Sequence, residues 1–200
     1  MRSEYIKKDA LERLFSALPY NTALCARLCL ETGMRVGDAV ALTPECLKKQ
    51  KVSYIAQKTG KKDIKPLTKA LYRELLAVCG KNFVFESRKA KSGHLTRQAV
   101  WKAVKKAALL AGETANVTPH SARKVYAVEL RKAKGLKATQ AALQHSNADT
   151  TALYAFSDVA LGGRVSSGEL ERLIDTIAKR TAREVLALLT NRANKRKKKA

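Results

Sequence analysis

The order of apolar and polar residues predicts helices through the first forty positions. Apolar side chains recur at helical spacing in residues 5–18, whereas residues 22–31 are apolar nearly all round. The second stretch therefore predicts a deeply buried helix, with Gly33 as its C-terminal cap. A further short helix is expected at residues 36–42. These boundaries place Arg35 at the junction of two helices.

The pattern then becomes typical of β-structure. Residues 52–55 and 64–67 carry β-branched and aromatic side chains, and residues 59–62 have the composition of a turn. Together they predict a small antiparallel hairpin with Lys58 at its tip. The NFVFES segment, residues 82–87, is also β-like.

Helical spacing resumes on both sides of that segment. Thr68 is expected to cap a helix that runs through Val78, and residues 100–108 have one apolar face. A long amphipathic helix is expected at residues 170–189. We therefore expect a mainly α fold with a small antiparallel β-sheet (α+β). It should form one domain at residues 1–190, followed by a basic, flexible tail at residues 191–200.

Thr118 and Pro119 form a strong helix-start signal, because a threonine hydroxyl can cap free amides and proline is tolerated in the first turn. This helix is expected at residues 120–134 and should end at Gly135. Two shorter helices should flank His145, at residues 138–144 and 149–156.

The charge of the chain points to a polyanionic partner. Forty Lys and Arg residues against seventeen Asp and Glu leave a formal net charge of +23, and binding to nucleic acid would relieve the self-repulsion. An anionic membrane surface is the alternative, but no apolar run approaches the roughly 20 residues that span a bilayer. The first residues also lack the apolar core of a signal peptide. We therefore expect no membrane partner and a cytoplasmic protein, associated with the nucleoid when bound to DNA.

The cysteines favour a reducing compartment. They show no CxxC spacing and have no neighbouring histidine to complete a zinc site, so reduced thiols are expected at Cys25, Cys29, Cys46 and Cys79.

The sequence HSAR places two phosphate-binding side chains near a predicted helix start. His120 and Arg123 are three residues apart and therefore lie on one helical face. The free amides and positive dipole of a helix N-terminus favour an anion such as a phosphodiester. A surface histidine beside a solvated arginine is the simpler alternative.

Three further segments contain candidate residues, each with an ordinary structural explanation. Arg35 lies among apolar residues in TGMRVGDAVAL, where a partly buried guanidinium needs an acceptor, and Asp38 could pair with it. Lys58, in QKTG, fits a turn lysine. His145 precedes Tyr154 by nine residues in LQHSNADTTALYAF, where a tyrosine in an apolar helix usually packs in the core.

In their order and spacing, these segments resemble the catalytic boxes of the tyrosine recombinase, or phage integrase, family. TGMRVGD resembles its first arginine box, QKTGKK its hairpin lysine, HSAR its HxxR box and LQHSNADTTALY its His-to-Tyr box. The corresponding catalytic set is Arg35, Lys58, His120, Arg123, His145 and Tyr154. The resemblance covers roughly residues 5–158 and implies that residues 1–190 form a catalytic DNA breaking and rejoining domain.

The resemblance implies a site-specific recombinase that cleaves double-stranded DNA through a 3′-phosphotyrosyl intermediate on Tyr154. His120 would accept the phenolic proton, and Lys58 would protonate the departing 5′ oxygen. His145 would hydrogen-bond the phosphate or help to place Tyr154.

The resemblance also implies that Arg35 and Arg123 bind the two nonbridging oxygens, while Asp38 orients Arg35. The two guanidiniums would take over the charge-neutralising task of Mg²⁺. The phosphotyrosyl linkage would retain the energy of the phosphodiester. We therefore expect neither a metal nor any other cofactor.

Resemblance to the family further implies a homotetramer on DNA, with C-terminal helices exchanged between protomers. The chain departs from the family by starting without an N-terminal DNA-clamping domain, as an excised domain or a naturally minimal enzyme would. HSAR also replaces the commoner H-[DE]-L-R box. Two alternative functions remain: a catalytically silent DNA-binding or architectural protein on the same fold, and a type IB topoisomerase.

Overall fold

The computed structural model describes two long stretches of the chain, residues 3–87 and 90–143. It also describes seven helical positions farther on: Gly168, Glu171, Ile174, Asp175, Ala178, Lys179 and Ala182. The chain divides into two compact units, Met1–Glu129 and Leu130–Ala200. His145, Tyr154, the helix expected at residues 149–156 and the tail at residues 191–200 lie outside the described residues.

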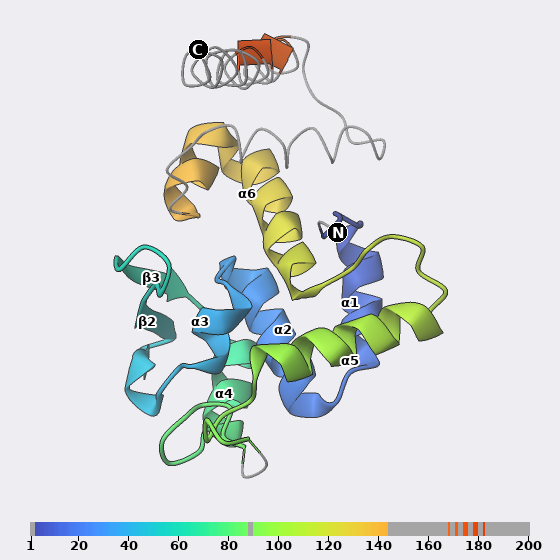
Figure 1. The fold of residues 1–200 in the computed structure, drawn as a ribbon. Coiled ribbons are helices and arrows are strands. Elements are labelled where there is room, and N and C mark those ends of the chain that lie inside the picture. The colour runs from blue at the N-terminus through green and yellow to red at the C-terminus, as the bar shows by residue number, and fades with distance from the viewer. Residues whose placement is uncertain are drawn as a thin grey trace, which may run out of the picture. The chain divides into compact units, whose positions relative to one another are not determined.

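A helical core dominates the first unit (Figure 1). Its helices are α1 (Lys8–Ser16), α2 (Tyr20–Thr32), α3 (Val36–Val40), α4 (Lys69–Val78), α5 (Arg97–Leu110) and the start of α6 (Pro119–Ala142). The central helix α2 packs against α1, α3, α4 and α5. Leu24, Cys25 and Leu28 on α2 are fully buried, so the predicted deep burial of this helix is confirmed.

The first helix is shorter than predicted. Tyr5 and Ile6 are buried but precede α1, which begins only at Lys8. The backbone N–H of Glu4 donates to the carbonyl oxygen of Asn116 at 3.0 Å. This bond ties the segment to a residue 112 positions away, which a local helical pattern cannot reveal.

Gly33 ends α2 as predicted. It adopts a left-handed conformation with φ 69°, and its N–H donates to the carbonyl oxygen of Cys29 at 2.9 Å. Arg35 follows in extended backbone and immediately precedes α3. The predicted junction of two helices at Arg35 is therefore confirmed.

The predicted hairpin is present and belongs to a three-stranded antiparallel sheet. Its strands are β1 (Leu47–Lys48), β2 (Lys51–Ile55) and β3 (Lys62–Pro66), in the order β1-β2-β3. The pattern predicted β2 and β3, but β1, which spans only two residues after the 3₁₀ helix Pro44–Cys46, was missed. Lys58 lies in the turn between β2 and β3, as expected.

The β-like NFVFES segment is not a strand, so that prediction was wrong. Val84 and Phe85 lie in a turn and are fully buried, and the Val84 N–H donates to the carbonyl oxygen of Leu42 at 2.8 Å. Glu86 makes only an isolated β-bridge with His94. Burial of the two apolar side chains in the helical core outweighs the local β-propensity of this segment.

The predicted helix starts are confirmed by their caps. The hydroxyl oxygen of Thr68 accepts from the Leu71 N–H at 3.3 Å at the start of α4. The hydroxyl oxygen of Thr118 accepts from the His120 N–H at 3.2 Å at the start of α6. Gly135 has φ 78° and ψ 176°, so helical geometry breaks where the pattern predicted an end.

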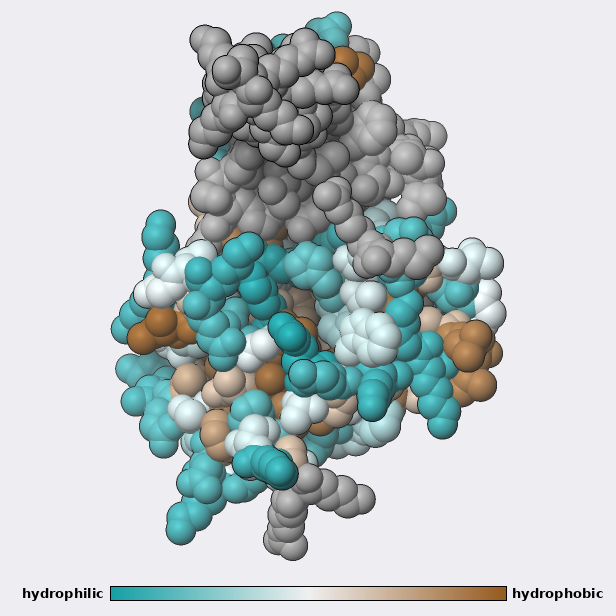
Figure 2. Space-filling model, viewed as in Figure 1, coloured by the Kyte–Doolittle hydropathy of each residue, from teal (hydrophilic) through white to brown (hydrophobic). Residues whose placement is uncertain are grey.

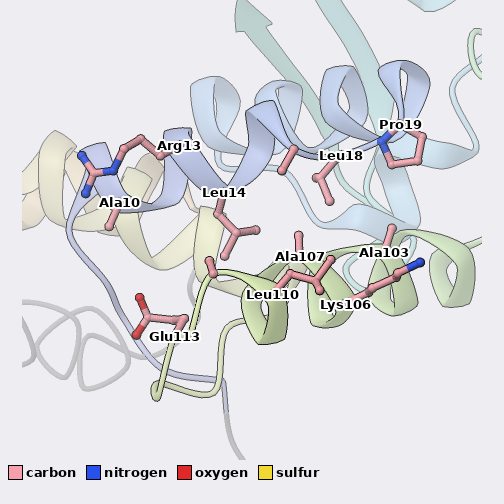
Figure 3. A pocket seen from close by; sticks show the side chains of 12 residues that line it. Ala10, Arg13, Leu14, Leu18, Pro19, Ala103, Lys106, Ala107, Leu110 and Glu113 are labelled. Carbon is pink, nitrogen blue, oxygen red and sulfur yellow. The ribbon is translucent and has the colours of Figure 1, made fainter.

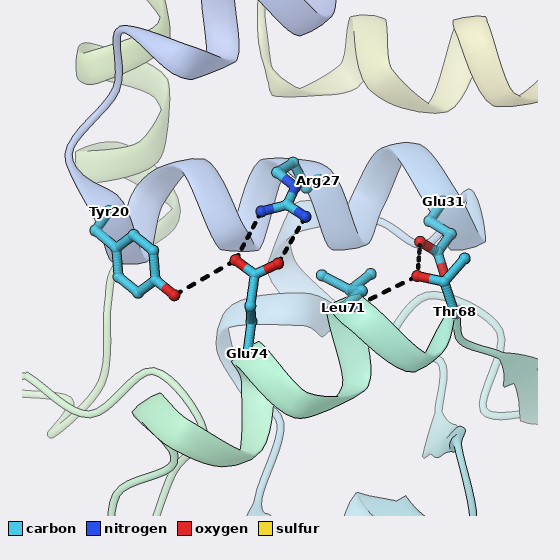
Figure 4. Close-up of polar contacts among 6 residues, drawn as sticks. All are labelled: Tyr20, Arg27, Glu31, Thr68, Leu71 and Glu74. Atoms are coloured by element: carbon cyan, nitrogen blue, oxygen red, sulfur yellow. Dashed lines mark hydrogen bonds and ion pairs between the residues drawn. The ribbon is translucent and has the colours of Figure 1, made fainter.

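A polar seam joins α2 to α4 (Figure 4). Both guanidinium Nη atoms of Arg27 donate to the carboxylate of Glu74, at 2.8 and 2.9 Å. Nearer the end of α2, the carboxylate of Glu31 accepts from the backbone N–H and the hydroxyl of Thr68, at 2.5 and 2.9 Å. Glu31 thus fixes the residue that caps α4, and α4 is held to the core at two points.

Hydrophilic side chains cover much of the face of the first unit in Figure 2. All four cysteines are free, as predicted, although Cys46 and Cys79 are only half-buried. In the part of the chain that the structure describes, no helix is both long and apolar enough to cross a membrane.

Candidate active site

The HSAR sequence lies at the start of α6, and its two middle residues are buried. Ser121 and Ala122 are fully buried, and the Ser121 hydroxyl donates to the carbonyl oxygen of Glu4 at 2.6 Å. These two residues therefore anchor the N-terminal segment to α6. His120 and Arg123 are the residues left for a site, as the three-residue spacing predicts.

Arg123 is buried and links two segments of the sequence that lie far apart. Only 4% of its surface is exposed, and its Nη1 donates to the carbonyl oxygen of Gly33. Gly33 is two residues from Arg35, which is half-buried. The first arginine box and the HxxR box thus meet in the folded chain, although ninety positions separate Arg123 from Gly33.

His120 is within electrostatic range of four cationic side chains. The pKa of its imidazole is lowered to about 4, by burial among protein atoms and by the positive charges of Arg123, Lys124, Arg35 and Lys58, in that order. His120 also remains accessible to solvent. Such a histidine is neutral at pH 7 and can accept a proton.

We call His120, Arg35, Lys58 and Arg123 the cationic site. They come from the start of α6, the junction before α3 and the hairpin turn. The segments that carry Arg35 and Arg123 are held together by the hydrogen bond from Arg123 Nη1 to the carbonyl oxygen of Gly33. The fifth and sixth predicted members, His145 and Tyr154, are outside the described residues.

Asp38 binds the hairpin, which corrects the expectation that it pairs with Arg35. Its Oδ1 accepts from the backbone N–H of Gln57 at 3.0 Å, and its Oδ2 has no hydrogen-bond partner among the described residues. A Cβ atom on Gly37 would lie 3.5 Å from the Gln57 side chain, so α3 and the hairpin turn are in close contact. The carboxylate of Asp38 is buried and therefore needs a hydrogen-bond donor, which the Gln57 N–H supplies.

Further polar residues that sequence reasoning missed lie on the inner face of the hairpin. Tyr54 Oη donates to Asp63 Oδ2 at 3.1 Å, and Lys65 Nζ lies 3.2 Å from the same oxygen. Burial raises the pKa of Tyr54, and the charge of Asp63 raises it further. Lys65 follows Asp63 by two residues, and side chains two apart on a strand lie on the same face. This spacing was the only signal in the sequence that both side chains point inward.

Several lysines outside the cationic site are exposed: Lys48, Lys49, Lys51 and Lys91. Exposed lysines are suited to contact a DNA backbone. Lys124, in contrast, is half-buried, and its Nζ donates to the carbonyl oxygen of Ser3 at 2.5 Å. It adds a positive charge to the surroundings of His120 instead.

A separate groove of about 700 Å³ lies between α1 and α5 (Figure 3). Leu14, Leu18 and Leu110 give it an apolar lining, and its described lining residues include none of the six predicted site residues. Within the described residues, no group of three or more His, Cys, Asp or Glu side chains could hold a metal ion.

Comparison with known proteins identifies the family to which this fold belongs. The chain belongs to the phage integrase family, whose model matches residues 4–160. The resemblance inferred from the sequence boxes is therefore confirmed.

Among curated relatives, the chain is 32% identical over 141 residues to the tyrosine recombinase XerD of Shewanella oneidensis. It is 33% identical over 138 residues to XerD of Rhizobium meliloti. These matches cover 64% of this chain in both cases, but only 46% and 44% of the relatives. The chain thus spans about half the length of the curated relatives it matches.

Solved structures share the fold at low sequence identity. A lambda integrase dimer bound to a COC′ core site matches 77% of this chain and 48% of its own, with a TM-score of 0.66 at 20% identity. The catalytic domain of bacteriophage HP1 integrase matches 78% of this chain and 89% of its own, with a TM-score of 0.57 at 20% identity. The predicted fold class, mainly α with a small antiparallel sheet, is confirmed.

Proposed function

We propose that this chain is a site-specific recombinase that cleaves and rejoins double-stranded DNA through a 3′-phosphotyrosyl intermediate. The observation that carries the proposal is the hydrogen bond from Arg123 to Gly33, which joins the HxxR box to the first arginine box, with the charges of Arg35, Lys58 and Arg123 near enough to lower the pKa of His120. A phosphodiester undergoing attack gains negative charge on its nonbridging oxygens, and guanidiniums can bind those oxygens through paired hydrogen bonds. Membership of the family supports the same assignment.

The proposed chemistry uses each group once. Tyr154 Oη attacks the phosphorus while its proton passes to neutral His120, and a P–Oη bond replaces the P–O5′ bond. Lys58 gives a proton to the departing 5′ oxygen and becomes a neutral amine. Arg35 and Arg123 hold the nonbridging oxygens, without a metal or another cofactor. A 5′-hydroxyl of another strand reverses these steps and rejoins the DNA.

Tyr154 and His145 enter the proposal through the sequence box LQHSNADTTALY. His145 would hydrogen-bond the same phosphate or help to place Tyr154. The proposed partner is duplex DNA, on which four copies of the chain would assemble and exchange C-terminal helices. Residues 1–190 would form the catalytic domain, residues 191–200 the tail, and the protein would lie in the cytoplasm or on the nucleoid.

Trapping of the covalent intermediate tests this function. The substrate is a pool of duplexes whose sequence is randomised around one nick. The nick lies just 3′ of the candidate cleavage position, and the strand to be cut is labelled at its 5′ end. Cleavage releases a short 5′-hydroxyl fragment that diffuses away, so the protein stays attached to the labelled strand. We expect a labelled protein band with the unmodified chain and none with Tyr154→Phe.

Tyr72→Phe, on helix α4, serves as the matched control and should form the band. A band that persists in Tyr154→Phe would reject the nucleophile. A chain that binds the duplexes but never forms the band would instead be a catalytically silent DNA-binding protein. If the band forms, two assays distinguish the enzymes. Recombination between two recovered sites indicates a recombinase, and relaxation of a supercoiled plasmid without recombination indicates a type IB topoisomerase.

A further inference from the structure

The hairpin that carries Lys58 has charged side chains on its buried face. Tyr54 and Asp63 are directly opposite each other in the register of β2 and β3, and the Tyr54 hydroxyl donates to Asp63 Oδ2 at 3.1 Å. Lys65 Nζ lies 3.2 Å from the same oxygen. The side chains of Lys65 and Asp63 are only 9% and 14% exposed. We call Tyr54, Asp63 and Lys65 the hairpin trio.

Such an arrangement specifies the strand register. A buried ammonium and a buried carboxylate are tolerated when they are paired and hydrogen-bonded. A slip of β3 by one residue would turn Asp63 and Lys65 to the solvent face and separate Asp63 from Tyr54. The trio therefore favours a single alignment of β2 with β3.

The alignment of the strands also determines where Lys58 lies. The turn that carries Lys58 directly connects β2 to β3. In it, the carbonyl oxygen of Ala56 accepts from the backbone N–H groups of Thr59 and Gly60, at 3.1 and 2.8 Å. The backbone N–H of Gln57, next to Lys58, is held by Asp38 at 3.0 Å. A tight turn anchored in this way moves with its strands, so a shifted register would displace the lysine.

Asp63 also acts electrostatically on α6. Burial raises the pKa of Tyr126, the negative charge of Asp63 raises it further, and the positive charge of Arg123 lowers it. The same carboxylate and the same guanidinium act on the pKa of Tyr54. The charge of Asp63 is thus within electrostatic range of the helix that supplies His120 and Arg123.

We propose that Asp63 is a positioning residue for Lys58: by holding Tyr54 and Lys65 it fixes the hairpin register that brings the Lys58 ammonium to the departing 5′ oxygen. This inference rests on the proposed function, in which the P–O5′ bond breaks as Lys58 transfers its proton. Asp63 itself touches neither DNA nor the reacting atoms.

A duplex with sulfur in place of the bridging 5′ oxygen tests the inference. A thiolate is a good leaving group without a proton, so this substrate does not need the general acid. Lys58→Ala should lose about 100-fold or more in cleavage rate on the oxygen duplex and stay within about threefold of the unmodified chain on the sulfur duplex. Asp63→Asn should show the same pattern, with a loss of about 10-fold or more on oxygen that sulfur restores.

Asp9→Asn, an exposed carboxylate change on α1, is the control and should leave both rates unchanged. Equal losses of Asp63→Asn on the two duplexes, or no loss on oxygen, would overturn the inference. If Asp63→Asn does not fold by circular dichroism, Tyr54→Phe replaces it, since that change removes only the hydroxyl that binds Asp63. Sulfur must then restore its rate, or the inference is rejected.

The two proposals fail in different ways. If the unmodified chain forms no covalent product on either duplex, the proposed function is wrong. If it forms the product on both duplexes and only the Asp63 and Tyr54 variants break the pattern, the function stands and the positioning role is wrong.

Discussion

The guanidinium of Arg123 donates to the carbonyl oxygen of Gly33, the residue that ends α2 in a left-handed conformation. Because Gly33 is two residues before Arg35, this bond places the two arginines of the cationic site relative to each other. Gly33 thus has two tasks: it ends a helix, and it presents a carbonyl oxygen to a buried guanidinium that needs acceptors.

Replacement of Arg123 by lysine should damage both stability and cleavage. An ammonium keeps the charge but lacks the planar fork that can bond Gly33 and a phosphate together. We expect the free energy of unfolding to fall by about 1–3 kcal/mol, measured by urea denaturation, because a buried carbonyl loses its donor. Cleavage of the nicked duplex should slow about 100-fold or more.

The matched control is Arg73→Lys, at an exposed position of α4. Stability and cleavage of this variant should equal those of the unmodified chain. An Arg123→Lys variant that cleaves at the normal rate would show that the guanidinium is not needed at the phosphate.

His120 should titrate well below the usual histidine range. Its pKa of about 4 means that the unfolded chain, with a histidine pKa near 6.5, binds more protons than the folded chain between those values. This residue therefore costs stability as pH falls from about 6.5 toward 4, and its effect is absent above that window. An NMR titration of the imidazole, assigned with His120→Gln, measures the midpoint.

Lys58→Met should raise that midpoint, because it removes one of the cations that disfavour the protonated ring. Binding of a duplex should also raise it, since phosphate brings negative charge to the site. A midpoint at or above 6.5 in the free protein would contradict the clustering of the four cations.

Asp38→Ala should loosen the hairpin turn. The variant removes the acceptor of the Gln57 N–H, so hydrogen exchange at that amide should accelerate. The free energy of unfolding should fall by about 1 kcal/mol, a typical value for one hydrogen bond. Asp38→Asn keeps an oxygen acceptor and should preserve the protection, whereas equal protection in Asp38→Ala would show that the bond does not hold the turn.

The seam between α2 and α4 should contribute little stability, and only when Glu74 is charged. The hydrogen bonds from Arg27 lower the pKa of Glu74, so the contribution is present above pH of about 4.5 and is lost as pH falls through the lowered folded pKa. Because both side chains are substantially solvated, Glu74→Gln should lower the free energy of unfolding by about 1 kcal/mol or less.

Measurement of Glu74→Gln by thermal denaturation at pH 7 and at pH 3 tests this sign. The difference from the unmodified chain should be present at pH 7 and should shrink at pH 3 and in high salt. A difference that is larger at pH 3 would contradict the assigned ion pair.

Local signals in the sequence were reliable where a feature depends on neighbouring residues. Thr68, Thr118 and Gly33 begin or end helices as predicted, because a side-chain cap or a left-handed backbone acts within one turn. Prediction failed where distant partners decide the structure. Phe85 is buried in a turn instead of a strand, and the segment before Lys8 pairs with Asn116 instead of joining α1.

The sequence by itself determined the residue types of the site, their order and the family, because each box is a short run with its own local structure. Only the tertiary structure decided that Asp38 binds Gln57, that Arg123 binds Gly33 and that Asp63 holds the inner face of the hairpin. The physical reason is distance along the chain. Contacts between residues 19 and 90 positions apart depend on how the helices pack around α2, and no local pattern records that packing.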